Sequence, residues 1–416
     1  MNRISPVTIL VGLQLALVLL FSNSSSLGLL WVPQLMGVIL FCAFVLECIV
    51  RRRSYFAAPT PVKLYIAFVV WAGVTIVLIQ GHPDQEVFDQ INTLIKVAIL
   101  TFLFSSIIRT RYQLLVVLWL LIAGFLVTIM LNYDQIAQIR TAEETGRLST
   151  NLRLAGTMGN SNTFGIYAII IAWIALQIFF STKHYSRFLA ISIVPVVLLV
   201  ALYTGSRKAM LAVPLSAFAI WWFYFRIQMA RTALKKYVLF IVALIIICVS
   251  SIWILVSPFG DRILMTVDGR PEDSFIERTD MLKAGVWMWL DYPMFGAGLD
   301  QFRVAAGKYG AGYGEYSHST VIEILVCTGI IGFVLYFGAL AMLFWETRKV
   351  ARTSADKFDT TIAGLLIGVL VIVLFFNLFA VMYYDRFIWP LLGAFSGYIH
   401  TVTHSSRALA TRRSRR

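Results

Sequence analysis

Long apolar segments separated by short polar or basic turns make up most of the chain. A helix that crosses a bilayer needs about 20 mostly apolar residues. The pattern therefore predicts an all-α polytopic membrane protein with about 12 transmembrane helices. We place the spans near residues 5–22, 28–50, 62–80, 91–108, 112–131, 163–181, 188–204, 209–225, 237–257, 329–345, 361–383 and 387–400.

Two longer polar loops interrupt this pattern and suggest how the chain is organised. Residues 1–257 would hold nine transmembrane helices together with the loop 132–162, and residues 258–318 would form a large loop containing helices. Three further transmembrane helices would follow in 319–400, and the chain would end in a basic tail, 401–416.

The composition agrees with a membrane protein and excludes other classes. Hydrophobic residues make up 59% of the 416 and charged residues 13%, with a mean hydropathy of +0.80. Soluble domains are usually about half apolar and about a quarter charged, and disordered chains lack so much apolar mass. The four cysteines lie in apolar stretches without a C-x-x-C pair, so we expect neither a disulfide framework nor a metal site.

The basic residues orient the predicted helices. The short turns on the side of the amino terminus, together with the tail, hold 22 of the 35 Lys and Arg residues. Cytoplasmic loops of membrane proteins carry such an excess, so both termini should be cytoplasmic and both long loops outside. Most of the formal charge of +14 then reflects orientation and implies no nucleic-acid partner. The sequence has no Walker A motif, so we expect no ATP.

Cations on the outer side are not needed for orientation, and two of them share the turn between the seventh and eighth spans. Gly205 permits backbone conformations that other residues avoid, and Ser206 can cap the following helix. Arg207 and Lys208 then stand at a helix start, where a guanidinium and the helix dipole both favour a phosphate. The alternative is a pair of interfacial side chains that snorkel to water.

A further cation, Lys96, lies inside an apolar span. Ionisable residues within membranes are energetically costly and usually line a cavity or have a partner. Because Lys96 is only a few residues from the outer end of its predicted span, it could instead snorkel to the interface.

The large loop 258–318 contains the strongest candidates for chemistry. Residues 277–290 predict an amphipathic helix lying along the membrane surface, with Arg278 on a stripe of apolar residues. The two glycines of 295–299 allow close backbone packing, but they do not form a dinucleotide site. His318 follows Tyr316 and precedes a capping-box pattern, Thr320 to Glu323, which predicts a helix start. Proximity to that helix start would favour a neutral imidazole, the form that can act as a base.

Several of these stretches together resemble one family, the O-antigen ligase and polymerase superfamily. They are Thr204-Gly205-Ser206-Arg207, Arg278 with the run Trp287 to Gly298, Ser317-His318-Ser319 followed by Gly329 and Gly332, and the Asn-rich segment 154–162. The likeness covers most of residues 90–345. One departure is Ser319, where many members have Asn after the His.

The resemblance implies a GT-C-like glycosyltransferase of the bacterial inner membrane that works on the periplasmic face. Such an O-antigen ligase takes a glycan from undecaprenyl pyrophosphate and passes it to a sugar hydroxyl of the lipid A–core oligosaccharide, without metal or other cofactor and with inversion at the anomeric carbon. On this basis the catalytic residues would be His318 as general base, with Arg207 and Arg278 as charge stabilisers. The substrate-binding residues would be Lys96, Ser206, Lys208, Tyr316 and Asp385.

Two alternatives remain open from the sequence. An O-antigen or exopolysaccharide polymerase would use the same donor, but its acceptor would be another lipid-linked repeat. A flippase or transporter of polyprenyl-linked glycans would also need cations within the membrane. It should, however, line a central cavity with charge from many spans, whereas here the charge gathers at the outer face and in one large loop.

The predicted topology can be tested with reporter fusions. Alkaline phosphatase fused after Gly307 should be active, because this residue lies in the large outer loop, and a fusion after Arg412 should be inactive. Phosphatase activity at Arg412, or none at Gly307, would contradict the topology. Immunoblotting for equal fusion protein provides the control.

Overall fold

The computed structural model describes residues 5–21, 31–51, 58–80, 84–144, 153–225 and 273–414, and these contain 14 α-helices and no strand. The helices and short helical turns are α1 (Pro6–Phe21), α2 (Trp31–Arg51), α3 (Thr60–Thr75) with η1 (Ile76–Gln80), α4 (Gln85–Ile107), α5 (Arg111–Leu131), α6 (Tyr133–Glu144), η2 (Gly156–Met158), α7 (Ser161–Ser181), α8 (Ser186–Tyr203), α9 (Arg207–Ile220) with η3 (Trp221–Phe225), α13 (Asp273–Asp291), α14 (Gln301–Ala305), η5 (Ala306–Tyr309), α15 (Thr320–Thr353), α16 (Lys357–Asn377) and α17 (Ile388–Ser414).

Eleven of the twelve predicted spans coincide with helices, and the twelfth, 237–257, lies outside the described residues. Within the described ranges, eight helices are long and apolar enough to cross a bilayer: α2, α3 with η1, α4, α5, α7, α8, α15 and α16. Two shorter apolar helices, Pro6–Phe21 and Lys208–Phe223, add to them. The protein is therefore an all-helical, multi-pass membrane protein.

Some predicted boundaries were wrong. The span expected at 361–383 ends at Asn377, after which an irregular segment runs to Phe387. The tail is not separate from the last span, because α17 continues through residue 400 to Ser414. The loop 132–162 contains a helix, α6, that the apolar pattern did not reveal, because its sequence is polar on most sides.

Polar side chains fix several helix starts at the membrane surface. Asp84 accepts from the backbone N–H of Val87 at 3.0 Å and begins α4. Thr110 and Gln113 form a complete capping box at the start of α5. Such caps satisfy backbone donors that have no partner inside the helix.

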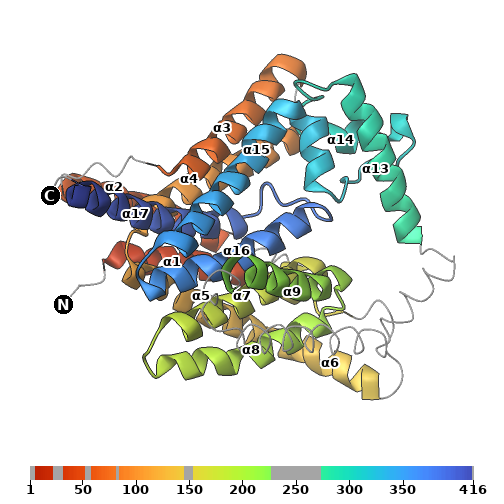
Figure 1. The fold of residues 1–416 in the computed structure, drawn as a ribbon. Coiled ribbons are helices and arrows are strands. Elements are labelled where there is room, and N and C mark those ends of the chain that lie inside the picture. The colour runs from red at the N-terminus through yellow and green to blue at the C-terminus, as the bar shows by residue number, and fades with distance from the viewer. Residues whose placement is uncertain are drawn as a thin grey trace.

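The helices pack as a bundle in which neighbours are often distant in sequence (Figure 1). α1 packs on α5, α4 on α17, α3 on α15, and α16 contacts α7, α9 and α15. Glycines bring some of these pairs close: Gly393 and Gly397 of α17 lie directly against backbone carbonyls of α4. Small residues at helix contacts are typical of membrane bundles, where close approach supplies the packing energy.

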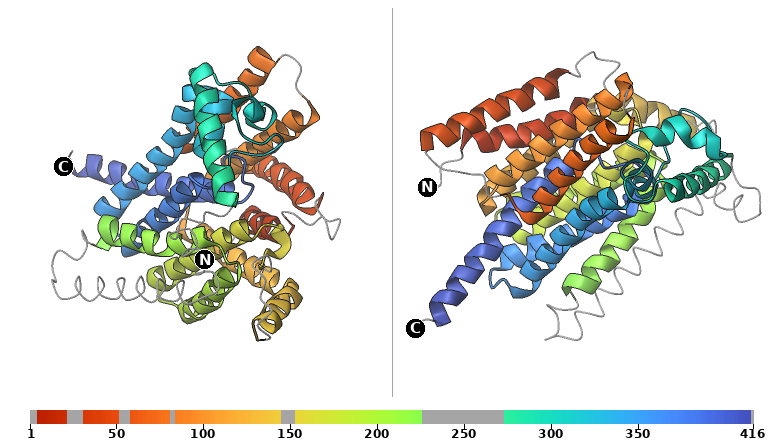
Figure 2. Two further views of the ribbon diagram at one scale, coloured as in Figure 1. Left: turned by 90° about the vertical axis from the view of Figure 1, so that its right-hand side faces the viewer. Right: turned by 90° about the horizontal axis from the view of Figure 1, so that it is seen from above.

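The segment from α13 to η5 lies at one end of the bundle, opposite the start of α1 and the end of α17 (Figures 1 and 2). α13 buries Met281 and Met288 against this segment and the start of α15, while Trp287 is 60% exposed on its other side. The predicted amphipathic helix is thus confirmed, and its exposed aromatic side is compatible with the predicted contact with the membrane surface.

A break in α15 joins this end segment to the bundle. Gly329 has φ 65° and ψ −169°, so the helix is interrupted where the sequence analysis placed the start of a span. The chain after α13 supplies backbone hydrogen bonds at the break: Ala297 N–H to Val326 O at 2.7 Å, Gly298 N–H to Cys327 O at 3.0 Å and Ile330 N–H to Pro293 O at 2.9 Å. The predicted close backbone packing of the two glycines is confirmed, since a Cβ on Gly296 would lie 2.5 Å from the carbonyl carbon of Cys327.

We predict that Gly329→Ala will destabilise the protein strongly. An added Cβ would lie 2.2 Å from Met294 O, and φ is positive. The strained backbone and the overlap should together cost about 2–6 kcal/mol. Apparent melting temperature in detergent measures the effect. Gly338→Ala is the matched control on α15, because its nearest neighbour, Leu64, leaves room at 3.9 Å. Equal melting temperatures for the two variants would refute the role given to the break.

Candidate active site

The turn between α8 and α9 is built as the sequence predicted. Gly205 has φ 58°, and Ser206 caps α9 by accepting from the N–H of Ala209 at 3.3 Å. Arg207 and Lys208 are therefore the first two residues of α9, where free backbone donors and the helix dipole favour an anion. The side chain of Arg207 lies outside the described part of the structure.

Loop 132–162 holds this turn from the other side. Arg153 donates to Thr204 O at 2.8 Å and to Asn162 Oδ1 at 3.1 Å, and Leu154 N–H bonds to Tyr203 O. Arg153, an outer cation that the sequence did not single out, thus positions the start of α9. Asn160 of the Asn-rich segment caps α7, so the polar residues of this segment have a structural use.

His318 stands in a strained turn immediately before α15. Its φ is 54°, a left-handed conformation that non-glycine residues adopt rarely and often at functional sites. The turn is stabilised by Ser317 Oγ, which donates to Ser319 O at 2.8 Å and accepts from Ser319 N–H at 3.2 Å. The side chain of Glu323, fully buried, accepts from Ser317 N–H at 3.1 Å.

The predicted helix start after His318 is confirmed, but the predicted capping box was wrong. α15 begins at Thr320 with Ser319 as the N-cap, and no side chain caps it. Thr320 Oγ1 instead donates to Ala380 O at 2.7 Å and accepts from Met382 N–H at 2.8 Å. A contact between residues 60 positions apart has replaced the local one, so the segment 378–387 supports the His318 turn.

The electrostatics bring His318, Arg278 and Lys208 together. Partial burial lowers the pKa of His318 below its usual range, and the cations Arg278 and Lys208 lower the pKa further. Glu315 and Glu277 act in the opposite direction. The expectation of a neutral imidazole is thus supported, but its causes are burial and two cations rather than the helix start alone.

Lys208 is also tied to the segment that supports His318. Its ammonium group donates a hydrogen bond to Phe379 O and lies 5.8 Å from the centre of the Phe379 ring. Since Ala380 O accepts from Thr320 Oγ1, the short stretch 379–380 connects Lys208 of α9 with the start of α15, next to the His318 turn. The sequence could not predict this role, because the contacts are made by backbone carbonyl groups, which every residue type carries.

Tyr316 and Asp385 belong to a neighbouring polar cavity of about 680 Å³. Asp385 accepts from Tyr167 OH at 2.7 Å and from the N–H groups of Phe387 and Ile388 at 2.9 and 2.8 Å. Burial raises the pKa of Asp385. Its contacts are thus mainly structural, whereas Tyr316 is 37% exposed at the cavity wall.

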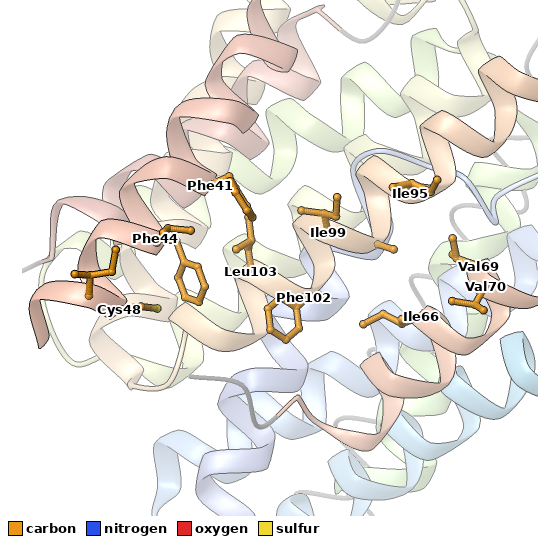
Figure 3. Close-up of a pocket in the computed structure, with 13 residues that line it drawn as sticks. Phe41, Phe44, Cys48, Ile66, Val69, Val70, Ile95, Ile99, Phe102 and Leu103 are labelled. Carbon is orange, nitrogen blue, oxygen red and sulfur yellow. The ribbon is translucent and has the colours of Figure 1, made fainter. Parts of the chain in front are cut away.

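Lys96 lies on the exposed side of α4. It follows Asp89 and Thr93 of the cavity wall at helical spacing, one turn further along α4. On an adjoining side of α4, Ile95 and Ile99 line an apolar groove of about 770 Å³ that α2 and α3 complete with residues such as Phe41 and Val69 (Figure 3). The groove suits hydrocarbon chains, so it places Lys96 beside a lipid-facing surface.

A cluster around the start of α4 was not recognised as such from the sequence. Arg303 donates to Asp300 Oδ2 at 2.7 Å, forms an ion pair with Glu86, and lies 3.8 Å from Asp84. The side chain of Gln80 donates to Leu299 O. These contacts hold the start of α14 against the end of η1 and the start of α4, so the acidic pair Asp84 and Glu86 has a cationic partner.

Comparison with protein families identifies the region that contains the turn of α9, α13 and His318. Residues 196–337 match the family model described as O-antigen ligase. The chain contains an O-antigen ligase family domain. This confirms the resemblance seen in the sequence, and comparison with curated proteins gave no match. The O-antigen ligase family domain is shared by ligases and polymerases, enzymes of glycan transfer with lipid-linked substrates.

The matched O-antigen ligase region holds six of the eight proposed site residues. They are Ser206, Arg207, Lys208, Arg278, Tyr316 and His318. Lys96 and Asp385 lie outside it: Asp385 lines the polar cavity, whereas Lys96 is exposed on α4 and is not among the residues of the cavity wall.

The charge environment of His318 leads to a prediction that needs no activity assay. Lys208→Gln removes a cation that disfavours the imidazolium form, so the pKa of His318 should rise and the ring should be protonated at higher pH. Diethyl pyrocarbonate reacts with neutral imidazole, and its rate at His318 against pH can be followed by mass spectrometry. Lys283→Gln is the control, because Lys283 pairs with Asp280 at 3.2 Å. A Lys208→Gln profile that is unchanged or moved to lower pH would contradict the charge assignment.

Proposed function

We propose that this protein is an O-antigen ligase. It would transfer a glycan from undecaprenyl pyrophosphate to a sugar hydroxyl of the lipid A–core oligosaccharide, on the periplasmic face of the inner membrane. The observation that supports the proposal is the strained turn of His318 directly ahead of α15, where Arg278 and Lys208 lower the pKa of its imidazole, within a domain of this family. The combination supplies a base and an anion site at the outer end of the bundle.

The proposed donor has a good leaving group, so cations matter more than a strong acid. As the bond between the anomeric carbon and the pyrophosphate oxygen breaks, negative charge grows on the pyrophosphate. Arg278, Lys208 and Arg207 with the start of α9 would stabilise that charge. Guanidinium groups suit this task because they bind phosphate oxygens in pairs.

His318 would act on the acceptor. A neutral imidazole nitrogen takes the proton of the attacking hydroxyl while the hydroxyl oxygen bonds to the anomeric carbon. The pyrophosphate leaves from the opposite side, so one displacement inverts the configuration. The lowered pKa keeps His318 neutral at the pH of the periplasm, and the nearby cations promote release of the proton afterwards.

Glu323 is a poor alternative base. Its side chain is fully buried and accepts a hydrogen bond from the backbone N–H of Ser317, the residue before His318. Asp385 is likewise occupied by Tyr167 and two backbone N–H groups. The side chain of His318 is only partly buried and remains accessible, so it is better placed to meet a hydroxyl.

The test is a lipopolysaccharide ladder gel of a deletion strain complemented with the wild-type gene or variants. Without the protein, long polymer should accumulate on the lipid carrier and no ladder should form. His318→Gln keeps size and hydrogen bonding but is a poor proton acceptor, so it should lower transfer by about 10²–10⁴. His404→Gln, at an exposed position of α17 far along the chain, is the control at equal membrane abundance.

Two results would change the proposal. A deletion strain that makes core carrying a single repeat would identify a polymerase instead. Near-normal transfer by His318→Gln would remove His318 as the base.

A further inference from the structure

The polar cavity beside the His318 turn has a chemistry of its own. Its walls come from α4, α7, the segment 314–316 and the segment 384–386, all at the same end of the bundle. At about 680 Å³ it falls within the usual size range of small-ligand sites. The cations that act on His318, Arg278 and Lys208, are not among its lining residues.

Its lining combines uncharged hydrogen-bonding groups with aromatic rings. Gln90 and Thr93 of α4 contribute an amide and a hydroxyl, and Tyr316 and Tyr384 contribute phenol groups. Burial raises the pKa of both tyrosines, so their hydroxyls stay protonated and can donate. Gln90 donates to Tyr383 OH at 2.9 Å, while its Oε1 atom is buried and has no hydrogen-bond partner among the described residues.

Two opposite charges complete the wall. Asp89 accepts from Gln85 Nε2 at 3.3 Å and Arg386 donates to Thr93 Oγ1 at 3.5 Å, but neither forms an ion pair within the described residues. A carboxylate has two acceptor oxygens and a guanidinium five donors, so each keeps hydrogen-bonding capacity for a ligand. The other charged residues of the wall are already engaged: Arg303 is bound by Asp300 and Glu86, and Asp385 accepts from Tyr167 and two backbone N–H groups. A carboxylate that accepts and a guanidinium that donates, beside amide, hydroxyl and phenol groups, match the alternating donors and acceptors of a sugar.

The position of the cavity relates it to the proposed reaction. Tyr316 lines the cavity, and His318, two residues later, is under the influence of Arg278 and Lys208. The segment 316–318 therefore joins the wall of the polar cavity to the histidine on which the two cations act. A base next to the cavity could take a proton from a hydroxyl bound there.

We propose that this cavity is the acceptor subsite and binds a neutral, hydroxyl-rich sugar residue. The inference rests on the proposed function, because it takes the cationic cluster as the donor site. The sugar could belong to the lipid A–core oligosaccharide or to a lipid-linked repeat. The two sources share the same chemistry and are separated below.

Binding to the purified full-length protein in nanodiscs tests the proposal. One probe is the core oligosaccharide released by mild acid from the lipopolysaccharide of the host strain, and the other is the repeat oligosaccharide released from its lipid carrier. Saturation-transfer NMR titrations give the affinity of each. The variants are Gln90→Leu, Thr93→Val and Asp89→Asn, with Asn92→Ala as the matched control on the exposed surface of α4 outside the cavity lining.

Asp89→Asn should weaken binding about tenfold or more, because a charged hydrogen-bond partner is lost, and the neutral substitutions about two- to tenfold. In transfer assays the acceptor KM should rise by the same factors, with the donor KM unchanged. Asn92→Ala should behave as wild type.

The outcomes separate the subsite from the proposed function. If wild type binds the repeat oligosaccharide but not the core, and the cavity variants weaken that binding, the subsite stands and the protein is a polymerase. Wild type that binds neither probe, cavity variants with wild-type affinity, or a rise in donor KM alone would overturn the subsite.

Discussion

The structure depends on backbone hydrogen bonds made across the break in α15. In a bilayer an interrupted helix leaves polar groups that water cannot reach, and each one costs several kcal/mol unless protein supplies a partner. The segment 293–298 supplies these partners, through three backbone bonds on both sides of Gly329. The break in the helix and the docked loop therefore stabilise each other.

This constraint sets the geometry of the active end of the molecule. The docked loop places α13, with Arg278, beside the first helical segment of α15, and that segment begins directly after His318. The segment 378–387 joins Thr320 at the start of α15 to Lys208 of α9, because carbonyl groups of this segment accept hydrogen bonds from both side chains. Two irregular segments of the chain thus position a histidine and two cations that come from three different elements.

Polar residues at this end divide into those that build the site and those that could act in it. Arg153 and Arg303, which look like the other outer cations in the sequence, are engaged by backbone or carboxylate groups of the protein. Arg278 and Lys208 act on His318, and Lys208 also donates to Phe379 O, while Asp89 and Arg386 line the polar cavity. The distinction matters most for Arg303, because a guanidinium held by two carboxylates has fewer donors left for a pyrophosphate.

The sequence by itself determined the helical membrane architecture, because hydrocarbon solvent requires long apolar segments with internally satisfied backbones. It also determined the turn of Gly205 and Ser206, the helix 277–290 and the helix start after His318, since these depend on neighbours along the chain. It could not determine which partners the Thr320 hydroxyl binds, which face of α4 carries Lys96, or which arginines are paired. Those outcomes depend on contacts between residues tens to hundreds of positions apart, such as Thr320 with Ala380 and Arg303 with Glu86. Only the tertiary structure decides them, because a hydrogen bond or ion pair forms according to distance in space and not to spacing in the sequence.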